Sequence, residues 1–324
     1  MHKTDLKIKL VVVFFLLSMV GEGFSTEVGR GGYAGAFIRM GLGARGMAMG
    51  GGSAALIDDG YAGYYNPAGI ALLSGHRFTT TLNSMALDRH LFYVGYSQSM
   101  GGRGRLMKAG FSAGWLCTGV DQIDARDFNG NSTGTLSNWE NCFFFSFALN
   151  ISPLFSLGFT SKLVSNRFPA ITDKKESISA DGLGFDFGII VKPLRNVVLG
   201  LSVRDLGAKY TWNTQKLWER GTETVNTFPR VLSGGIVLEK LFGCVTFLCD
   251  LKKVEYQPLV YTAGTEMELY KRFFLRAGLR DKKLTFGGGC QFKVFGKITQ
   301  YDYAFVPDPV APRGNHVFTW SFIF

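Results

Sequence analysis

The chain has 324 residues, of which 42 are glycine and 29 phenylalanine, and 19% of its residues are charged, below the usual quarter. Many glycines and aromatic residues at modest hydropathy fit a β-barrel. The five cysteines match no metal-site pattern, and we expect neither a metal nor another cofactor.

The first 25 residues have the layout of a secretory signal peptide. Basic residues precede an apolar run at 10–20, and small residues follow it up to Ser25. A membrane anchor is the alternative, but this run is too short for a bilayer core of about 30 Å. We therefore expect an exported protein. The net charge of +10 is then expected to act in the lumen, on anionic lipid head groups or on an anionic ligand. We expect no nucleic-acid partner.

Residues 26–76 are rich in glycine and show little alternation, which predicts a compact segment rather than strands. Residues 41–46 match G-x-G-x-x-G, but no strand precedes them and no βαβ unit surrounds them, so we reject a nucleotide site. Further along, Asp58 or Asp59 is expected to cap a short helix, and Asn66-Pro67 to turn the chain into another.

From residue 77 onward, apolar and small or polar residues alternate with the period of two that is typical of strands, most clearly in Leu183–Ile189. The lengths of these alternating segments suit tilted membrane strands, and the even number of segments suits a closed bacterial barrel. The fourteen predicted strands are residues 77–84, 90–99, 105–117, 142–150, 154–165, 182–192, 196–206, 230–240, 244–253, 259–269, 272–280, 283–293, 296–306 and 315–324.

Short and long connections alternate along these strands, as in bacterial barrels with short periplasmic turns and longer extracellular loops. The short turns include those near Arg103 and at 151–153, and the long loops are 118–141, 166–181, 207–229 and 306–315. A pair of exported β-sandwiches or a jelly roll is the alternative fold, but it does not need this alternation. Cys117 and Cys142 bracket one long loop, which leaves a disulfide open, although free cysteines are favoured.

The chain ends in a strand with an aromatic row, Phe318, Trp320, Phe322 and Phe324, all on one face. Such a row turned toward lipid resembles the last strand of bacterial outer-membrane proteins. The assembly machinery recognises that strand. We therefore expect a 14-stranded antiparallel transmembrane barrel over residues 77–324 in the outer membrane. The last strand would pair with the first, and Phe324 would serve as the assembly signal.

The segments Ala34–Gly41 and Gly43–Gly51, together with D-D-x-x-x-x-Y-Y-N-P-A-G from Asp58, resemble the FadL/PorV superfamily of outer-membrane proteins. Within it, the similarity is to the UPF0164 set of spirochaetes and their relatives. The resemblance implies that residues 26–76 fold into the barrel as a hatch with short helices. It also implies a structural role for Asn66, Pro67 and Ala68, and ligands that bind in the barrel and leave through a gap at a kinked strand.

A basic residue near the middle of the lipid face costs about 2–4 kcal/mol, so charged residues of the strands are expected to face the lumen. By strand parity, the inward charges include Lys162, Asp186, Arg204, Asp250 and Lys252. Glu266 and Glu268 are expected to pair with Arg276 and Arg280 of the next strand in a charge ladder. The sharper alternative is that Arg276, Arg280 and Lys293 receive the anionic head group of a ligand.

Two functions remain open, and neither is enzymatic, because the four histidines form no catalytic arrangement with other residues. The first is a transporter of hydrophobic small molecules such as long-chain fatty acids, with Phe37, Met40, Met47 and Met49 lining the site. The second is a PorV-like protein that binds or shuttles secreted protein cargo through its long loops. The aromatic residues of those loops are Trp139, Tyr210, Trp212 and Trp218.

Overall fold

The computed structural model describes residues 32–101, 107–168, 177–215, 221–308, 311 and 313–324. The predicted signal peptide, the turn at Arg103 and Trp218 lie outside these ranges. The short helices are η1 (Ala36–Arg39), α2 (Ala44–Ala48), α3 (Ala62–Tyr65) and η2 (Pro67–Leu72). The strands are β1 (His76–Ser84), β2 (Arg89–Met100), β3 (Lys108–Arg126), β4 (Ser132–Ser152), β5 (Phe155–Phe168), β6 (Ile178–Leu194), β7 (Val197–Leu206), β8 (Lys209–Asn213), β9 (Glu223–Thr227), β10 (Val231–Leu241), β11 (Val245–Val254), β12 (Val260–Leu269), β13 (Phe273–Arg280), β14 (Lys283–Val294), β15 (Lys297–Val306) and β16 (Asn315–Ile323).

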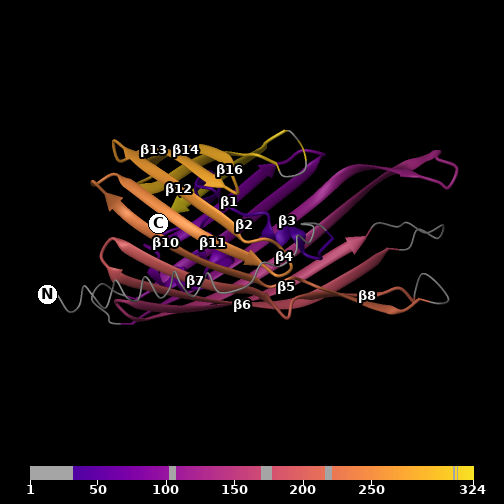
Figure 1. Cartoon of the computed structure of the whole chain (residues 1–324), viewed down its shortest axis with the longest axis horizontal. Helices are drawn as coiled ribbons and strands as arrows, with labels where there is room; N and C mark the ends of the chain where they lie inside the picture. Colours follow the sequence, from indigo (N-terminus) through magenta and orange to yellow (C-terminus); the bar gives the residue numbers. More distant parts are fainter. Residues whose placement is uncertain (1–31, 102–106, 169–176, 216–220, 309–310, 312) are drawn as a thin grey trace.

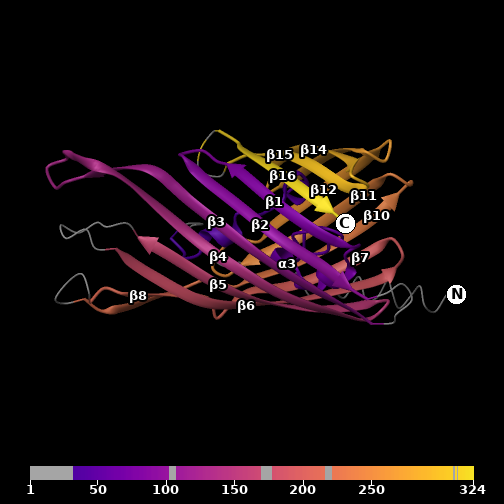
Figure 2. The same ribbon diagram turned by 180° about the vertical axis from the view of Figure 1, so that it is seen from behind.

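Fourteen of these strands form one closed antiparallel barrel, as predicted (Figures 1 and 2). Each barrel strand pairs with its neighbours, and β1 pairs with β16 from Arg77↔Ile323 to Ser84↔His316. The remaining two, β8 and β9, form a hairpin that joins β6 through Ala180↔Trp212 beyond the barrel strands. Each of the fourteen predicted segments corresponds to one barrel strand.

The outer face of the barrel is apolar, whereas the inner face holds polar and small residues. In β16, Phe318 and Trp320 are 49% and 37% exposed, while the alternate residues Val317 and Thr319 are buried. A continuous outward belt of phenylalanine, leucine and tyrosine side chains is not compatible with water but suits lipid, so the fold is a transmembrane barrel. No helix in the described part of the chain is both long and apolar enough to cross a bilayer.

One predicted loop is mostly strand, and a second is partly strand. β3 continues to Arg126 and β4 starts at Ser132, so most of the predicted loop at 118–141 is a two-stranded ribbon that projects past the barrel (Figure 1). The loop expected at 166–181 is likewise shortened by β5 and β6. Apolar alternation fades where strands leave the lipid, although the backbone pairing continues, and this made the prediction wrong. Cys117 and Cys142 are both free, because Cys142 pairs across the ribbon with Leu116 and so faces the opposite side from Cys117.

The described residues of the hatch, 32–75, lie inside the barrel and contact its wall on two sides. On one side the α2 segment hydrogen-bonds the wall through Ala44 N–H to Thr319 Oγ1 (2.8 Å) and Gly50 N–H to Thr285 Oγ1 (3.0 Å). On the other side η2 packs so closely against β5 that a Cβ on Gly158 would fall on the backbone of Pro67 and Ala68. Inward glycines in wall strands therefore mark where the hatch backbone approaches.

Asn66 joins these contacts at the turn before η2. Its Nδ2 donates to the carbonyl oxygens of Ala54 (2.7 Å), Ile189 (3.1 Å) and Leu201 (3.3 Å), and its Oδ1 accepts from Ala68 N–H. The cap expected at Asp58 or Asp59 is wrong, because α3 begins only at Ala62 and has no side-chain cap.

Candidate functional site

Two cavities lie between the hatch and the wall in the described part of the chain. The upper cavity, toward the long-loop end, has a volume of about 30 Å³, and the lower cavity, toward the short turns, about 500 Å³. Residues 39–41, 47, 51, 53–54 and 64–65 of the hatch line the upper cavity on one side. Strands β7, β10, β11, β12 and β13 line it on the other.

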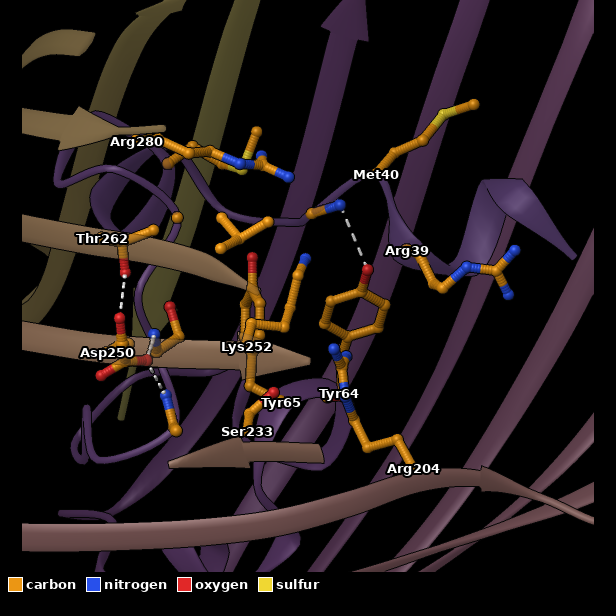
Figure 3. Close-up of a pocket in the computed structure, with 16 residues that line it drawn as sticks. Arg39, Met40, Tyr64, Tyr65, Arg204, Ser233, Asp250, Lys252, Thr262 and Arg280 are labelled. Carbon is orange, nitrogen blue, oxygen red and sulfur yellow. Dashed lines mark hydrogen bonds between the residues drawn. The ribbon is translucent and has the colours of Figure 1, made fainter. Parts of the chain in front are cut away.

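Cationic side chains gather at the upper cavity. Arg204, Lys252 and Arg280 come from three different strands and extend toward the space between them (Figure 3). Arg39 lines the margin, and its guanidinium turns away to donate to the Ala34 carbonyl oxygen (2.9 Å). Asp250 is the one acidic residue among those that line the cavity, and its Oδ2 accepts from the backbone N–H groups of Ser53 and Ala54.

Arg204 is positioned by an irregularity in β7. Successive residues Arg204 and Asp205 both face the lumen, Asp205 has φ 64°, and the β6–β7 register shifts between Phe185 and Phe187. The Arg204 guanidinium lies over the rings of Tyr64 (5.3 Å) and Tyr65 (5.9 Å). It also donates to the Tyr64 carbonyl oxygen, while its Nε is buried without a partner.

A buried triad holds this irregularity. Lys162 Nζ lies 2.8 Å from Asp186 Oδ2 and 2.5 Å from Asp205 Oδ1, and Asp205 N–H donates to Asp186 Oδ1. All three side chains are at most 1% exposed. Beyond Asp205 the chain turns inward, so that Ala208 and Lys209 lie over Gly184 and Gly182 of β6.

This inward turn closes the mouth of the barrel at the long-loop end with an apolar cluster, here called the mouth cluster. Phe228 packs on Gly35 of the hatch, and Tyr210 contacts the Phe228 ring at 4.9 Å. Tyr210 also donates to Glu140 Oε1 (3.3 Å). The cluster comprises Phe37, Ile38, Leu42, Tyr61, Tyr64, Met85, Leu91, Tyr93, Leu116, Cys142, Phe144, Val164, Ala180, Ala208, Tyr210 and Phe228.

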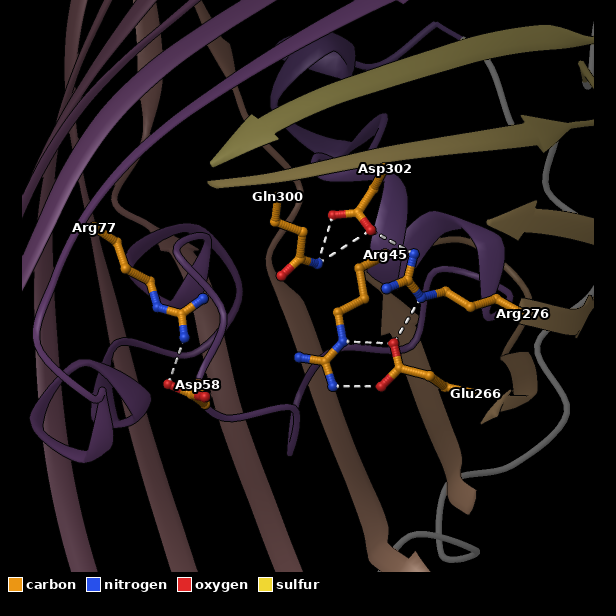
Figure 4. A network of polar contacts seen from close by, with 7 residues as sticks. All are labelled: Arg45, Asp58, Arg77, Glu266, Arg276, Gln300 and Asp302. Atoms are coloured by element: carbon orange, nitrogen blue, oxygen red, sulfur yellow. Dashed lines mark hydrogen bonds and ion pairs between the residues drawn. The ribbon is translucent and has the colours of Figure 1, made fainter. Parts of the chain in front are cut away.

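The lower cavity is polar and contains an ion-pair network between hatch and wall (Figure 4). Arg45 of α2 binds Glu266 with both Nε (2.9 Å) and Nη2 (2.7 Å). Arg276 bridges Glu266 (2.6 Å) and Asp302 (2.7 Å). The expected ladder is therefore half correct, because the register pairs Glu266 with Arg276 but places Thr262 opposite Arg280 and Phe274 opposite Glu268.

The predicted ligand residues separate into different places. Met40, Met47 and Arg280 meet at the upper cavity. Phe37 lies in the mouth cluster, and Met49 lies in a second packed cluster against the wall. Arg276 is engaged in the lower network, and Lys293 is exposed near the end of β14 and lines neither cavity.

Arg204 and Lys252 also line the upper cavity, although only their inward direction was predictable. Parity along a strand shows which face a side chain occupies. It does not show that residues about fifty positions apart converge on one point. The only local signal was a charged residue at an inward position, and many such residues form ordinary ion pairs.

The buried carboxyl group of Asp59 in the hatch is expected to make the stability of the fold depend on pH. Asp59 is 9% exposed, and burial raises its pKa above the usual value, whereas the charges of Arg45 and Arg77 oppose the shift. Since the folded-state pKa lies above the unfolded one, folding takes up a proton, and this group stabilises the fold increasingly as the pH falls through the folded pKa.

We expect Asp59→Asn to remove this contribution while keeping the Oδ1 atom that accepts from Tyr61 N–H. At neutral pH the variant should have a more stable hatch than the wild type, and the difference should shrink on acidification to about pH 4. Hydrogen exchange of the hatch amides across this range measures it. Identical pH profiles for the two proteins would contradict the assignment.

Comparison with solved structures places the chain in a known fold. The toluene transporter TbuX of Ralstonia pickettii superposes with a TM-score of 0.62 at 15% identity, covering 88% of this chain and 98% of that one. The Pseudomonas putida toluene transporter TodX gives 0.57 at 16%, covering 88% and 99%. A Pseudomonas aeruginosa FadL homologue gives 0.55 at 13%, covering 87% and 97%. The chain thus has the fold that the FadL resemblance implied.

No protein-family model and no curated protein sequence matches this chain. The narrower UPF0164 assignment therefore stays a prediction.

Proposed function

We propose that this chain lies in the bacterial outer membrane and passes hydrophobic small molecules through its barrel, with long-chain fatty acids as the expected class. The main support is the mouth cluster, which lines the long-loop end with apolar and aromatic side chains from wall and hatch together. A lumen that served only ions or sugars would need polar groups there. The barrels of similar fold include toluene transporters and a monoaromatic hydrocarbon channel.

Both the mouth cluster and the hatch are closely packed, so passage requires part of this packing to open. The hatch residues 36–43 are the best candidates to move. Within the described part of the chain, the hydrogen bonds of these residues stay inside the hatch, such as Gly41 N–H to Tyr64 Oη and Leu42 N–H to Tyr65 Oη. The α2 and η2 segments, by contrast, bind the wall directly.

Uptake of labelled oleate by cells that produce the protein tests this function. We expect uptake above that of cells without it, and we expect Phe37→Ser to reduce uptake several-fold because it places a hydroxyl in the mouth cluster. Phe242→Ser, at a turn residue that is 97% exposed, is the matched control and should transport normally. Oleate uptake equal to the background, with no fatty acid recovered by native mass spectrometry, would refute the proposal for this class.

The alternative, a protein that binds secreted cargo, has one supporting observation. The five residues of β9 are all exposed and form the outer strand of the β8–β9 hairpin, an open edge to which another strand can add. Two of the aromatic residues expected to bind cargo are less available, since Tyr210 is buried and Trp212 is packed against the mouth cluster. Co-purification of a secreted protein that is lost on Val225→Pro would favour this alternative.

A further inference from the structure

We propose that the upper cavity is a binding site for one compact monoanion of carboxylate or halide size, which bridges the hatch to the wall. The anion is either a free ion or the carboxylate of a transported acid. Only the second source rests on the proposed function.

The first observation is a set of donors that have no acceptor. Arg204 is 3% exposed and its Nε has no hydrogen-bond partner. Within the described residues, Lys252 and Arg280 form no ion pair or side-chain hydrogen bond, although both extend into the cavity (Figure 3). Buried donors normally find an acceptor. One buried cation, Arg204, and two half-buried cations, Lys252 and Arg280, converge on a cavity whose one carboxylate, Asp250, uses Oδ2 for backbone N–H groups, so the cavity suits a negative ligand.

The second observation is the charge balance around the cavity. Lys162 and Arg204 lie beside the two carboxylates of Asp186 and Asp205, which offset them. Arg39 lies in the field of Asp205 and, more weakly, in that of Glu140 on β4. Lys252 and Arg280 then face a single carboxylate, that of Asp250. Counted by formal charge, these five cations and four carboxylates leave one positive charge uncompensated, which matches a monoanion better than a dianion or a neutral ligand.

The third observation is size. The cavity of about 30 Å³ holds roughly two water-sized groups and leaves no room for an acyl chain. A carboxylate, chloride or nitrate fits. A longer ligand would have to leave its tail outside the cavity, beside Met40 and Met47 at the lining.

The site has a structural consequence because its two sides belong to different units. Hatch residues 39–41, 51 and 53–54 face wall residues of β7, β11 and β13 across the cavity. An anion between them reduces the repulsion among the cations, and a ligand that binds only the docked state stabilises that state by mass action. We therefore expect the docking of the hatch to depend on the anion.

The experiment titrates sodium acetate and sodium chloride into the purified full chain at constant ionic strength, with a bulky sulfonate as the exchanged anion. Hydrogen exchange of hatch amides 39–54 is the readout. Acetate or chloride should slow exchange in a saturable way, and Lys252→Gln and Arg280→Gln should each weaken binding about tenfold or more. Lys293→Gln, at the exposed lysine, is the matched control and should bind as the wild type does.

Decanoate and decanol distinguish the two sources of the anion. If the anion is a head group, decanoate protects at lower concentration than acetate and decanol does not compete. If the anion is a free ion, acetate and decanoate protect equally. Absence of saturable protection in the wild type, or equal protection in both glutamine variants, would overturn the site. Failed oleate uptake with intact acetate protection would refute the proposed function and leave the anion site standing.

Discussion

Replacing Gly158 by valine is expected to undock the hatch while leaving the barrel closed. Gly158 sits in β5 with its face toward η2, and any Cβ there would fall on the backbone of Pro67 and Ala68. A backbone cannot rotate out of the way as a side chain can. We expect the docked state to lose about 1–3 kcal/mol or more, the usual cost of overpacking.

Strand pairing uses backbone groups alone, so β5 should keep its hydrogen bonds to β4 and β6 when residue 158 gains a side chain. The barrel should remain resistant to detergent at room temperature, as heat-dependent migration on a gel would show. The loss of hatch packing should appear as increased single-channel conductance and faster hydrogen exchange of residues 66–72.

Gly288→Val provides the matched control. Gly288 also lies within a wall strand, opposite Leu275, but it faces outward, and a Cβ there would meet only the Phe274 carbonyl oxygen at 3.4 Å. This variant should conduct and exchange as the wild type does. If Gly288→Val opened the channel as much as Gly158→Val, the effect would come from strand distortion and not from the hatch contact.

The contrast between these glycines also indicates what the sequence could predict. Alternation identified all fourteen barrel strands, because each strand separates a lipid face from a lumen face at every second residue. It also placed Lys162, Asp186 and Arg204 inward. However, the sequence does not distinguish Gly158, which packs against the hatch, from Gly288, which faces outward, away from the hatch. The difference depends on a hatch segment about a hundred residues away from Gly158.

The candidate site was less predictable for a related reason. Arg276 and Arg280 are four residues apart on one strand with the same inward parity, yet one is engaged by two carboxylates and the other by none. The register of β12 against β13 decides this, since it sets Glu266 opposite Arg276. The bulge at Asp205 was also outside the reach of periodicity, because a bulge breaks the period that serves to detect the strand.

Replacing Lys162 by methionine is expected to destabilise the protein by roughly 3–5 kcal/mol. Methionine fills nearly the same volume but leaves two carboxylates, Asp186 and Asp205, buried without their cation. The cost of an uncompensated buried charge exceeds the modest net value of the original ion pairs. Denaturant unfolding in detergent, followed by tryptophan fluorescence, measures the loss.

The partly exposed ion pair of Lys192 and Glu239, at the lining of the lower cavity, offers a control with the same chemical change. Their charged atoms are 3.8 Å apart and both side chains are about a quarter to a third exposed. Lys192→Met should therefore cost less than about 1 kcal/mol. A similar loss in both lysine variants would mean that the burial of the triad has no special importance.

Neutralising the two carboxylates in the Lys162→Met background separates charge from packing. With Asp186→Asn and Asp205→Asn added, the three triad positions carry no charge, and asparagine tolerates the left-handed backbone that residue 205 adopts (φ 64°). Part of the lost stability should return, but not all of it, because the buried Arg204 then lacks the two carboxylates that offset its charge. The bulge should nevertheless be weaker, since no cation links β5 to β7, so proteolysis at residues 207–210 should be faster than in the wild type.

Recovered stability together with a protease-sensitive mouth would mean that the triad sets the path of the chain into the mouth more than it stabilises the barrel. If the triple variant is less stable than Lys162→Met, the two carboxylates contribute more through their contacts with Arg204 than they cost as unpaired charges, and the charge explanation of the Lys162→Met loss fails.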